Sequence, residues 1–532
     1  MNNPINNPIN NPINNPINNP INNPINNPIN NPINNPIDNL ELKKICDDIL
    51  PLIYNYINDI NIDKESVYIY KSYKELTELF SLILEDNPNN NIFNDIKNTI
   101  KYSTHTNHPM YVDKLYSGSS AIGIISELII TLLNTNVHTF NSSPVFTLIE
   151  LETIKTINNI IGYDINSDGI FCPGGSYSNM LALLCARNKI NPNIKKVGYN
   201  NKKYSIFMSE QGHYSIINSV IILGLGLDSV YKIKCDNNNK INLRDLENKI
   251  IESIKKNEIP LFINITAGTT VLGIFDNISN VYEISQKYKI WLHLDASWGG
   301  SVLMSDKYKY LLENCHLTDS ITWNPHKMLG IPLQCSVLLI KDTKTLIDTT
   351  NIDVNYLYHY NQENNQENNL DLGKKTFQCG RKADAFKLWL SWRYYGKKGF
   401  ETRINTAFDN VNYFINEITT KYNDNFILVS VPSFVNICFW YIPHKYNNIL
   451  SEIKKDFNNI KKYYNDINEI TKNIHNIIIK NGKLMIDYSD LPNGIPYFFR
   501  LIISSPNINS NYIDKIINEI IDSSEIVYGR EK

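Results

Sequence analysis

A lysine and an aspartate stand in settings that suit an aldehyde cofactor. Lys327 ends the polar turn 324–327, and Asp295 ends the apolar run that starts at Ile290. A lysine amine can form a Schiff base with an aldehyde, and a carboxylate can keep a ring nitrogen protonated. Together they predict a site for pyridoxal phosphate (PLP). Either residue alone more often has a structural role, because strand-end aspartates cap helices and most lysines lie on the surface.

Other predicted strand ends carry groups that suit the same cofactor. Residues 174–179 read Gly-Gly-Ser-Tyr-Ser-Asn before a helix predicted to open near Ser178, where amides and hydroxyls can ligate a phosphate. His213 follows the strand that ends near Met208, and its ring can stack on a planar cofactor. Thr270 follows the next strand. Each feature has an ordinary structural explanation, but four successive strand ends with suitable groups favour a PLP site.

The composition is that of a globular protein with two or three structural units. Of 532 residues, 42% are hydrophobic and 20% are charged, with a net charge of −2. This charge gives no electrostatic reason to expect nucleic acid or a membrane surface as partner. The sequence has no apolar run of transmembrane length and no basic stretch typical of a secretory signal. Eight scattered cysteines without a CxxC pair favour reduced thiols and a cytoplasmic location.

Four regions are predicted along the chain. Nine Asn-Asn-Pro-Ile repeats cannot build a helix or a core, so they predict a disordered tail. Apolar spacing predicts helices between about residues 40 and 101, for example over 76–84, and again over 121–133. The predicted regions are the tail (1–37), an N-terminal helical segment (38–115), a large cofactor-binding domain (116–382) and a small C-terminal domain (383–532).

Helices alternate with short buried strands between about residues 150 and 345. The predicted strands are 204–208, 261–265, 291–295, 320–322 and 336–340. The predicted helices are 178–187, 214–223, 243–255 and 278–287. This order predicts an α/β fold with a mostly parallel sheet, helices on both faces and a ligand at the carboxyl ends of the strands. A helix over 383–421 and strands over 426–430, 436–441 and 498–504 predict a smaller α+β domain.

Six motifs between residues 105 and 530 carry a family resemblance. They read GIFCPGGSYSNM (169–180), AGTTVLG (267–273), WLHLDASWGG (291–300), WNPHKM (323–328), QCGR (378–381) and NICFWYIP (436–443). The chain resembles the group II PLP-dependent amino-acid decarboxylases, in the glutamate, cysteine-sulfinate and acidic amino-acid branch. The resemblance implies the aspartate aminotransferase-like fold (PLP fold type I) and a homodimer with active sites at the subunit interface. It also implies release of CO2 from an L-amino acid, an acidic one such as glutamate, aspartate or cysteine sulfinate, giving the corresponding amine.

The resemblance implies a role for each matched residue. Lys327 would bind the cofactor aldehyde, Asp295 would pair with the ring nitrogen, and His213 would be the base stacked on the ring. The residues implied for the phosphate and the ring edge are Tyr177 (through its backbone), Ser178, Asn324, His326 and Thr270. Tyr356 matches a mobile-loop tyrosine that protonates the substrate carbon after CO2 leaves. Arg500 matches an arginine that binds a substrate carboxylate.

Three departures from the family pattern bear on the substrate and the loop. Lys114 stands where glutamine is usual, and His138 stands where glutamate decarboxylases carry phenylalanine. Two added cations favour an acidic substrate, although Lys114 could equally point to solvent. Residues 371–374 read Asp-Leu-Gly-Lys where the family has Asp-Thr-Gly-Asp. The loop after Tyr356 is about two residues longer than usual in the family. A loop that closes less readily would allow deamination by-products.

Two other classes of function stay open from the sequence. One is another fold-type-I PLP enzyme, such as an aminotransferase or an oxidative deaminase. The other is a catalytically silent PLP-fold binding protein. A nucleotide site is not expected, because residues 224–228 lack the third glycine of a dinucleotide motif and no P-loop motif is present. No metal site is expected, because His105 and His108 have no evident further ligands.

Overall fold

The computed structural model describes residues 39–61, 66–80, 82–84, 92–352, 354, 370–492 and 494–529. One compact unit comprises the residues up to Asn58 together with Lys71–Lys101, and the second comprises Asp59–Tyr70 and all residues from Tyr102 on. The repeat tail lies outside the described residues. The predicted boundaries near residues 115 and 382 stay predictions. In the part of the chain that the structure describes, no helix has the length and apolar character needed to cross a membrane.

The N-terminal helices are α1 (Asn39–Asn61), α2 (Tyr73–Leu79) and α3 (Ile92–Tyr102). Helix α2 begins with a capping box, in which the Ser72 side chain and Glu75 each accept a hydrogen bond from the other's backbone. The chain leaves the helical conformation at Phe80, so the predicted helix does not extend to Leu84. Apolar spacing predicted the helices of this region but not the end of α2.

A seven-stranded sheet forms the centre of the second unit. Its strands are β1 (Asp168–Cys172), β2 (Tyr204–Ser209), β3 (Val230–Ile233), β4 (Ile259–Thr266), β5 (Trp291–Ala296), β6 (Ser320–Trp323) and β7 (Ser336–Ile340). They lie in the order β1-β7-β6-β5-β4-β2-β3, and only β7 runs antiparallel to its neighbours. The prediction of a mostly parallel sheet is confirmed. The short edge strand β3 was not predicted, because its four residues include the exposed Lys232.

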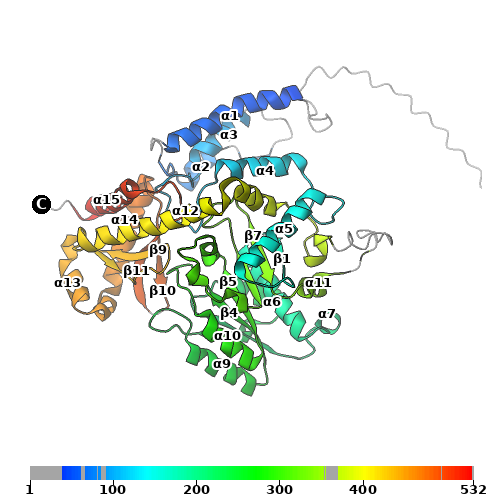
Figure 1. The fold of residues 1–532 in the computed structure, drawn as a ribbon. Coiled ribbons are helices and arrows are strands. Elements are labelled where there is room, and N and C mark those ends of the chain that lie inside the picture. The colour runs from blue at the N-terminus through cyan, green and yellow to red at the C-terminus, as the bar shows by residue number, and fades with distance from the viewer. Residues whose placement is uncertain are drawn as a thin grey trace, which may run out of the picture. The chain divides into compact units, whose positions relative to one another are not determined.

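Helices cover both faces of this sheet, as predicted. They are α4 (Ala121–Leu133), α5 (Pro144–Ile161), α6 (Gly175–Ile190), α7 (Ile194–Val197), α8 (Ser215–Ile222), α9 (Leu243–Lys255), α10 (Ile278–Tyr288) and α11 (Lys344–Thr350). Side chains alternate between the faces along a strand, so Phe207 joins one core cluster while Ile206 and Met208 join the other. Residues of α9 and α10 belong to the first cluster, and residues of α6 and α8 belong to the second (Figure 1).

Helix α5 was missed by the sequence reasoning for a physical reason. It buries Thr147, Glu150 and Thr153 together with apolar residues, so no clean apolar stripe marks it in the sequence. The Glu150 carboxylate forms a buried ion pair with Arg381 at 2.6 Å and accepts the Phe171 amide. These partners come from distant parts of the chain.

The C-terminal region is built on an antiparallel sheet. Its strands, in the order β10-β11-β9-β8, are β8 (Phe426–Leu428), β9 (Asn436–Tyr441), β10 (Asp487–Leu491) and β11 (Ile495–Ile502). Its helices are α12 (Asp384–Thr420), α13 (Asn447–Lys455), α14 (Tyr464–Asn481) and α15 (Ser510–Tyr528). The described 3-10 helices are Leu227–Ser229, Gly299–Met304, Lys309–Leu312, Cys315–Leu317, Leu372–Lys375, His444–Tyr446 and Phe457–Tyr463. The predicted smaller α+β architecture is confirmed, whereas β10, whose sequence alternates with polar residues, was not predicted.

A segment from before the large sheet lies along this small sheet. The Val112 amide donates to the Met485 carbonyl at 2.9 Å, and the Ile502 amide donates to the Val112 carbonyl at 2.9 Å. Tyr111 and Met485 also form a parallel bridge. The residues just after Val112 are therefore held beside β10 and β11.

Candidate active site

The sheet register brings the two chemically important residues to the same edge. Asp295 lies in β5 opposite Thr266 of β4 and Thr322 of β6. The chain turns after β6, where the Lys327 amide donates to the Asn324 carbonyl at 3.0 Å. Because β4, β5 and β6 are parallel, their carboxyl ends meet at this edge.

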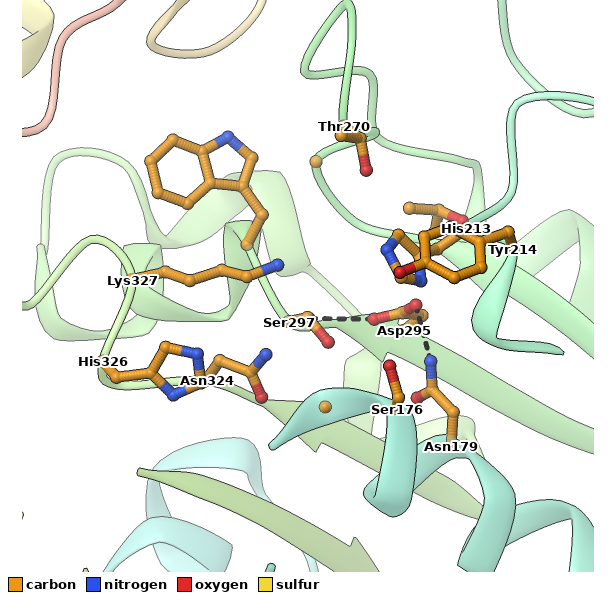
Figure 2. A pocket seen from close by; sticks show the side chains of 14 residues that line it. Ser176, Asn179, His213, Tyr214, Thr270, Asp295, Ser297, Asn324, His326 and Lys327 are labelled. Atoms are coloured by element: carbon orange, nitrogen blue, oxygen red, sulfur yellow. Dashed lines mark hydrogen bonds between the residues drawn. The ribbon is translucent and has the colours of Figure 1, made fainter. Parts of the chain in front are cut away.

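A cavity of about 230 Å³ opens at these strand ends. Figure 2 shows the Lys327 side chain extending across it in the direction of Asp295. Six predicted site residues line it: Lys327, Asp295, His213, Thr270, Asn324 and His326. The other lining residues are Gly175, Ser176, Asn179, Tyr214, Thr266, Gly268, Ser297 and Trp298. The structure therefore gathers residues from five separate segments into one site.

Burial and neighbouring groups together set the protonation of the lysine and the aspartate. Burial lowers the pKa of Lys327, although the charge of Asp295 acts in the opposite direction. Burial pushes the pKa of Asp295 up, but His213, the Ser297 amide and Lys327 outweigh it and hold that pKa below its usual value. The Ser297 amide donates to Asp295 Oδ1 at 3.1 Å. The site therefore holds a fixed negative charge near an amine that loses its proton more easily than usual.

A buried chain of hydrogen bonds supports Asp295 from behind. Asn179 Nδ2 donates to Asp295 Oδ2 and to Ser215 Oγ, each at 2.9 Å. Asn179 Oδ1 accepts from His293 Nε2 at 3.1 Å, and His293 Nδ1 lies 2.7 Å from Ser320 Oγ. Burial lowers the pKa of His293 to about 4, so the ring is neutral. Its proton is therefore on Nε2, and Nδ1 accepts from the Ser320 hydroxyl.

The sequence reasoning did not assign roles to these supporting residues. Asn179 ends the predicted phosphate motif, and His293 precedes Asp295 by two residues on the same face of β5. A histidine in the interior of a fully buried strand is the signal that could have identified this network, because a buried ring nitrogen needs a partner.

His213 lies on the loop after β2, close to Asp295 (Figure 2). Burial lowers its pKa, Asp295 raises it and Lys327 lowers it further. Its Nδ1 accepts the Ser215 amide at 3.2 Å, so the proton of the neutral ring is on Nε2. The Tyr214 ring lies beside it, with 4.4 Å between the centroids.

One wall of the cavity is polar. It is formed by the first turn of α6 with Ser297 and Asn324. A Cβ atom placed on Gly175 would lie 2.5 Å from Asn324 Nδ2 and 2.9 Å from Ser297 Oγ, so these side chains need a glycine there. Asn324 Oδ1 is buried and has no hydrogen-bond partner within the described ranges. A helix N-terminus with such polar groups suits an anion, as the phosphate prediction requires.

Two residues predicted for the phosphate point elsewhere with their side chains. Ser178 is buried, and its hydroxyl lies 2.8 Å from that of Ser336 in β7. The Tyr177 hydroxyl lies 2.9 Å from Thr376 Oγ1. Ser176 lines the cavity instead. The reason is helical geometry, since successive side chains turn by about 100° around the helix axis. The backbone role predicted for Tyr177 stays a prediction.

His326 is held in place by the turn that follows the lysine. Its Nδ1 lies 2.6 Å from the Cys335 carbonyl oxygen, and burial lowers its pKa to about 4. The ring is therefore neutral, and it lines the cavity beside Lys327. Tyr356 lies outside the described residues, so its predicted role stays a prediction.

The three predicted substrate residues do not line the cavity. The His138 ring packs over Gly373, where an added Cβ atom would lie 2.2 Å from it, and burial lowers its pKa. A neutral ring does not supply the extra cation expected from the sequence. Lys114 Nζ lies 3.0 Å from carboxylate oxygens of both Asp113 and Asp487. Arg500 lies just behind the cavity wall, where its Nη1 contacts the Thr270 carbonyl at 3.5 Å.

The residues of the cavity fit PLP. A buried lysine, an aspartate with a lowered pKa and a histidine line the cavity, and the first turn of α6, whose amides suit an anion, forms a polar wall. Fold and site together define a PLP-dependent enzyme with a mostly parallel sheet and a smaller C-terminal domain.

Comparisons with known proteins give the family. Residues 74–442 match the pyridoxal-dependent decarboxylase conserved domain. The chain is 36% identical over 487 residues to the acidic amino acid decarboxylase GADL1 of Xenopus tropicalis, covering 90% of this chain and 92% of that protein. It matches the crystal structure of mouse CSAD with a TM-score of 0.84 and 33% identity, covering 91% of this chain and 99% of the other. The chain belongs to the pyridoxal-dependent decarboxylase family.

The predictions of fold, cofactor and enzyme class are thereby confirmed. The protein is a PLP-dependent amino-acid decarboxylase with the fold of that family. Oryza sativa TDC, solved with PLP and tryptamine, matches with a TM-score of 0.82 but only 17% identity, covering 93% of this chain and 99% of that one. That likeness shows the shared fold alone.

Proposed function

We propose that this decarboxylase releases CO2 from an acidic L-amino acid, namely glutamate, aspartate or cysteine sulfinate, and gives the corresponding amine. The observation that carries the proposal is the position of Arg500. Its guanidinium is buried and contacts the carbonyl of Thr270, a residue of the cavity wall. A cation there suits the carboxylate that every amino-acid substrate carries, so Arg500 supports an amino-acid substrate and does not by itself select an acidic one. The name of the Xenopus tropicalis relative, an acidic amino acid decarboxylase, supports the same substrate class.

The residues of the cavity take the following proposed roles. Lys327 binds the cofactor aldehyde, and its lowered pKa favours the neutral amine that this bond needs. Asp295 keeps a proton on the ring nitrogen, because its own pKa is held low. His213 packs on the ring, and Ser176 and Asn324 bind the phosphate. When bound, PLP supplies an acceptor for the electron pair left by departing CO2.

The orientation of the substrate decides which of its bonds breaks. The bond that stands perpendicular to the cofactor ring is the reactive one, so the groups that hold the substrate determine the reaction. Arg500 would provide one such contact. Tyr356, outside the described residues, is proposed as the donor that protonates the substrate carbon after CO2 leaves.

The test is an amino-acid panel assayed for CO2 release with PLP present. Glutamate, aspartate and cysteine sulfinate should react faster than leucine, tyrosine and tryptophan. Keto acid and ammonia are measured in the same samples, because an oxidative deaminase or an aminotransferase would produce keto acid. Preference for an aromatic amino acid would contradict the proposed substrate. Repeating the panel with Lys114→Gln tests whether that lysine contributes to the preference.

We also propose that the protein is a cytoplasmic homodimer. Large apolar side chains on α4 and α5 are exposed in the single chain, among them Leu128 at 58%, Leu132 at 75% and Val145 at 66%. Exposed apolar surface of this kind is typical of an interaction face. All eight cysteines are free thiols, as is typical of a reducing compartment. Sedimentation equilibrium should give twice the mass of the chain, and Leu132→Asp should weaken the association.

A further inference from the structure

Four charged residues form a cluster behind the cavity wall, which we call the Asp487 cluster: Asp113, Lys114, Asp487 and Arg500. Asp487 Oδ2 lies 3.1 Å from Arg500 Nη2 and 3.0 Å from Lys114 Nζ. Lys114 Nζ also lies 3.0 Å from Asp113 Oδ1. Two carboxylates thus face two cations, and burial raises the pKa of Asp113 above its usual value. The positive charge that the sequence predicted beside the substrate is compensated within the protein.

Strand pairing builds this cluster. Asp487 of β10 and Arg500 of β11 are direct cross-strand partners, so their side chains lie on the same face of the small sheet. The segment around Val112 pairs with residues beside both strands and brings Asp113 and Lys114 to the same place. The ion pair between Asp487 and Arg500 is therefore set by the backbone.

Arg500 links the cluster to the active site. Its Nη2 donates to the Asp113 carbonyl at 3.1 Å, and its Nη1 contacts the carbonyl of Thr270, which lines the cavity. The side chain is only 9% exposed. Its Nε–H is buried and has no hydrogen-bond partner in the part of the chain that the structure describes. A buried guanidinium with an unused donor can accept another anion.

The ionisation of the cluster follows from its contacts. Burial raises the pKa of Asp487, but Lys114 and Arg500 outweigh this and hold that pKa below the usual value. Burial lowers the pKa of Lys114, but Asp113 and Asp487 outweigh this and raise it. At neutral pH, Asp487 is therefore an anion bound to Arg500 in the absence of substrate.

We propose that Asp487 is a positioning residue that competes with a substrate carboxylate for Arg500. The substrate must displace Asp487 from the guanidinium, or share the guanidinium with it, before Arg500 can bind the substrate fully. Lys114 assists by offering Asp487 a second cation at 3.0 Å, close to the 3.1 Å that separates Asp487 from Arg500. Asp487 thereby weakens substrate binding without taking part in bond breaking. This inference rests on the proposed function, in which Arg500 binds a substrate carboxylate.

The test replaces the competing anion while keeping its shape. In Asp487→Asn the amide no longer neutralises Arg500, whereas Lys114 keeps Asp113 as partner. KM for the preferred acidic amino acid should fall about tenfold with kcat unchanged, which corresponds to about 1.4 kcal/mol of binding free energy. Asp487→Glu keeps the charge and should keep the wild-type KM. A purely structural role for Asp487 predicts a raised KM or a lowered kcat instead.

A matched control and a binding measurement complete the design. Asp409 lies on the surface of α12, where its Oδ1 is 3.7 Å from Lys307 Nζ. Asp409→Asn removes this carboxylate and should leave KM unchanged. Calorimetric titration of glutarate, a dicarboxylate without an amine, measures binding apart from turnover. Glutarate should bind Asp487→Asn about tenfold more tightly than wild type.

The outcomes separate this inference from the proposed function. Absence of CO2 release from every amino acid would contradict the proposed function, whatever glutarate does. Normal CO2 release together with unchanged KM and glutarate affinity in Asp487→Asn would overturn the role of Asp487 alone. A fall in KM that also occurs in Asp409→Asn would likewise overturn it, because the effect would then come from general surface charge.

Discussion

Replacing Asn179 with alanine should damage both the stability of the protein and its cofactor site. The Asn179 amide binds three buried partners, which are the Asp295 carboxylate, the Ser215 hydroxyl and the His293 ring. In Asn179→Ala, His293 Nε2–H loses its nearer acceptor and keeps only the 3.5 Å contact with Thr322 Oγ1. Asp295 loses one of the two hydrogen bonds described here, and only the Ser297 amide remains.

The size of the effect follows from these contacts. A hydrogen bond to a charged group contributes about 1.5–3 kcal/mol, and a buried donor without a partner costs about 1–3 kcal/mol. The sum is a loss of about 4 kcal/mol in the free energy of unfolding, less if a water molecule enters the space. PLP affinity should fall as well, by about tenfold or more, because Asp295 is held less firmly at the ring nitrogen.

The assays are urea unfolding of the protein without cofactor and PLP titration followed by absorbance. Asn188→Ala is the matched control, because Asn188 is buried in the same helix, and its amide contacts the Thr349 carbonyl at 3.4 Å and Arg187 Nε at 3.2 Å, away from the cavity. Asn188→Ala should lose about 1 kcal/mol or less and keep its PLP affinity. Equal losses in the two variants would refute the reasoning, since the effect would then be that of any buried asparagine in α6.

Three further predictions concern the cofactor and pH. The wild type should show a visible absorption band that borohydride removes. Lys327→Ala should lose both this band and CO2 release. A band that persists in the variant would contradict the role of this lysine. Gly175→Ala should weaken PLP binding about tenfold in titrations, because its methyl group would lie within 3 Å of two cavity side chains, and unchanged affinity would show that they yield. Lowering the pH from 7 to 5 should reduce the free energy of unfolding by about 2 kcal/mol. The pKa values of His293 and His326 are about 4 in the native protein, so between pH 7 and 5 mainly the unfolded state takes up their protons, which lowers the free energy of unfolding. The pKa of Asp276 is raised to about 6 in the native protein, so its protonation raises the free energy of unfolding. The loss from the two histidines is larger than the gain from Asp276. Urea unfolding at both pH values checks this, and a rise in stability toward pH 5 would contradict it.

Much of the large domain could be predicted because its signals are local. Strands β2, β4, β5 and β7 are rich in apolar residues, and chemically distinctive residues follow several of the predicted strands. The parallel order of such strands brings their carboxyl ends together, so the sequence alone predicts that Asp295, Lys327 and His213 meet. The cavity contains all three.

The direction of individual side chains was harder to predict. Ser176 and Ser178 are both plausible phosphate ligands in sequence, but the start of α6 at Gly175 turns only Ser176 toward the cavity. The start of a helix depends on its packing as well as on its sequence, and a shift of one or two residues changes which face a side chain occupies.

The sequence by itself determined the catalytic chemistry of this protein, since a lysine, an aspartate and a histidine at successive strand ends already specify what cofactor they can hold. Only the tertiary structure decided whether the positive charges of Lys114 and Arg500 are compensated by carboxylates of the protein. Lys114 and Asp487 are 373 residues apart, and β10 carries no clear strand signal. The physical reason is that a charge is compensated by its neighbours in space, and strand register chose those neighbours here.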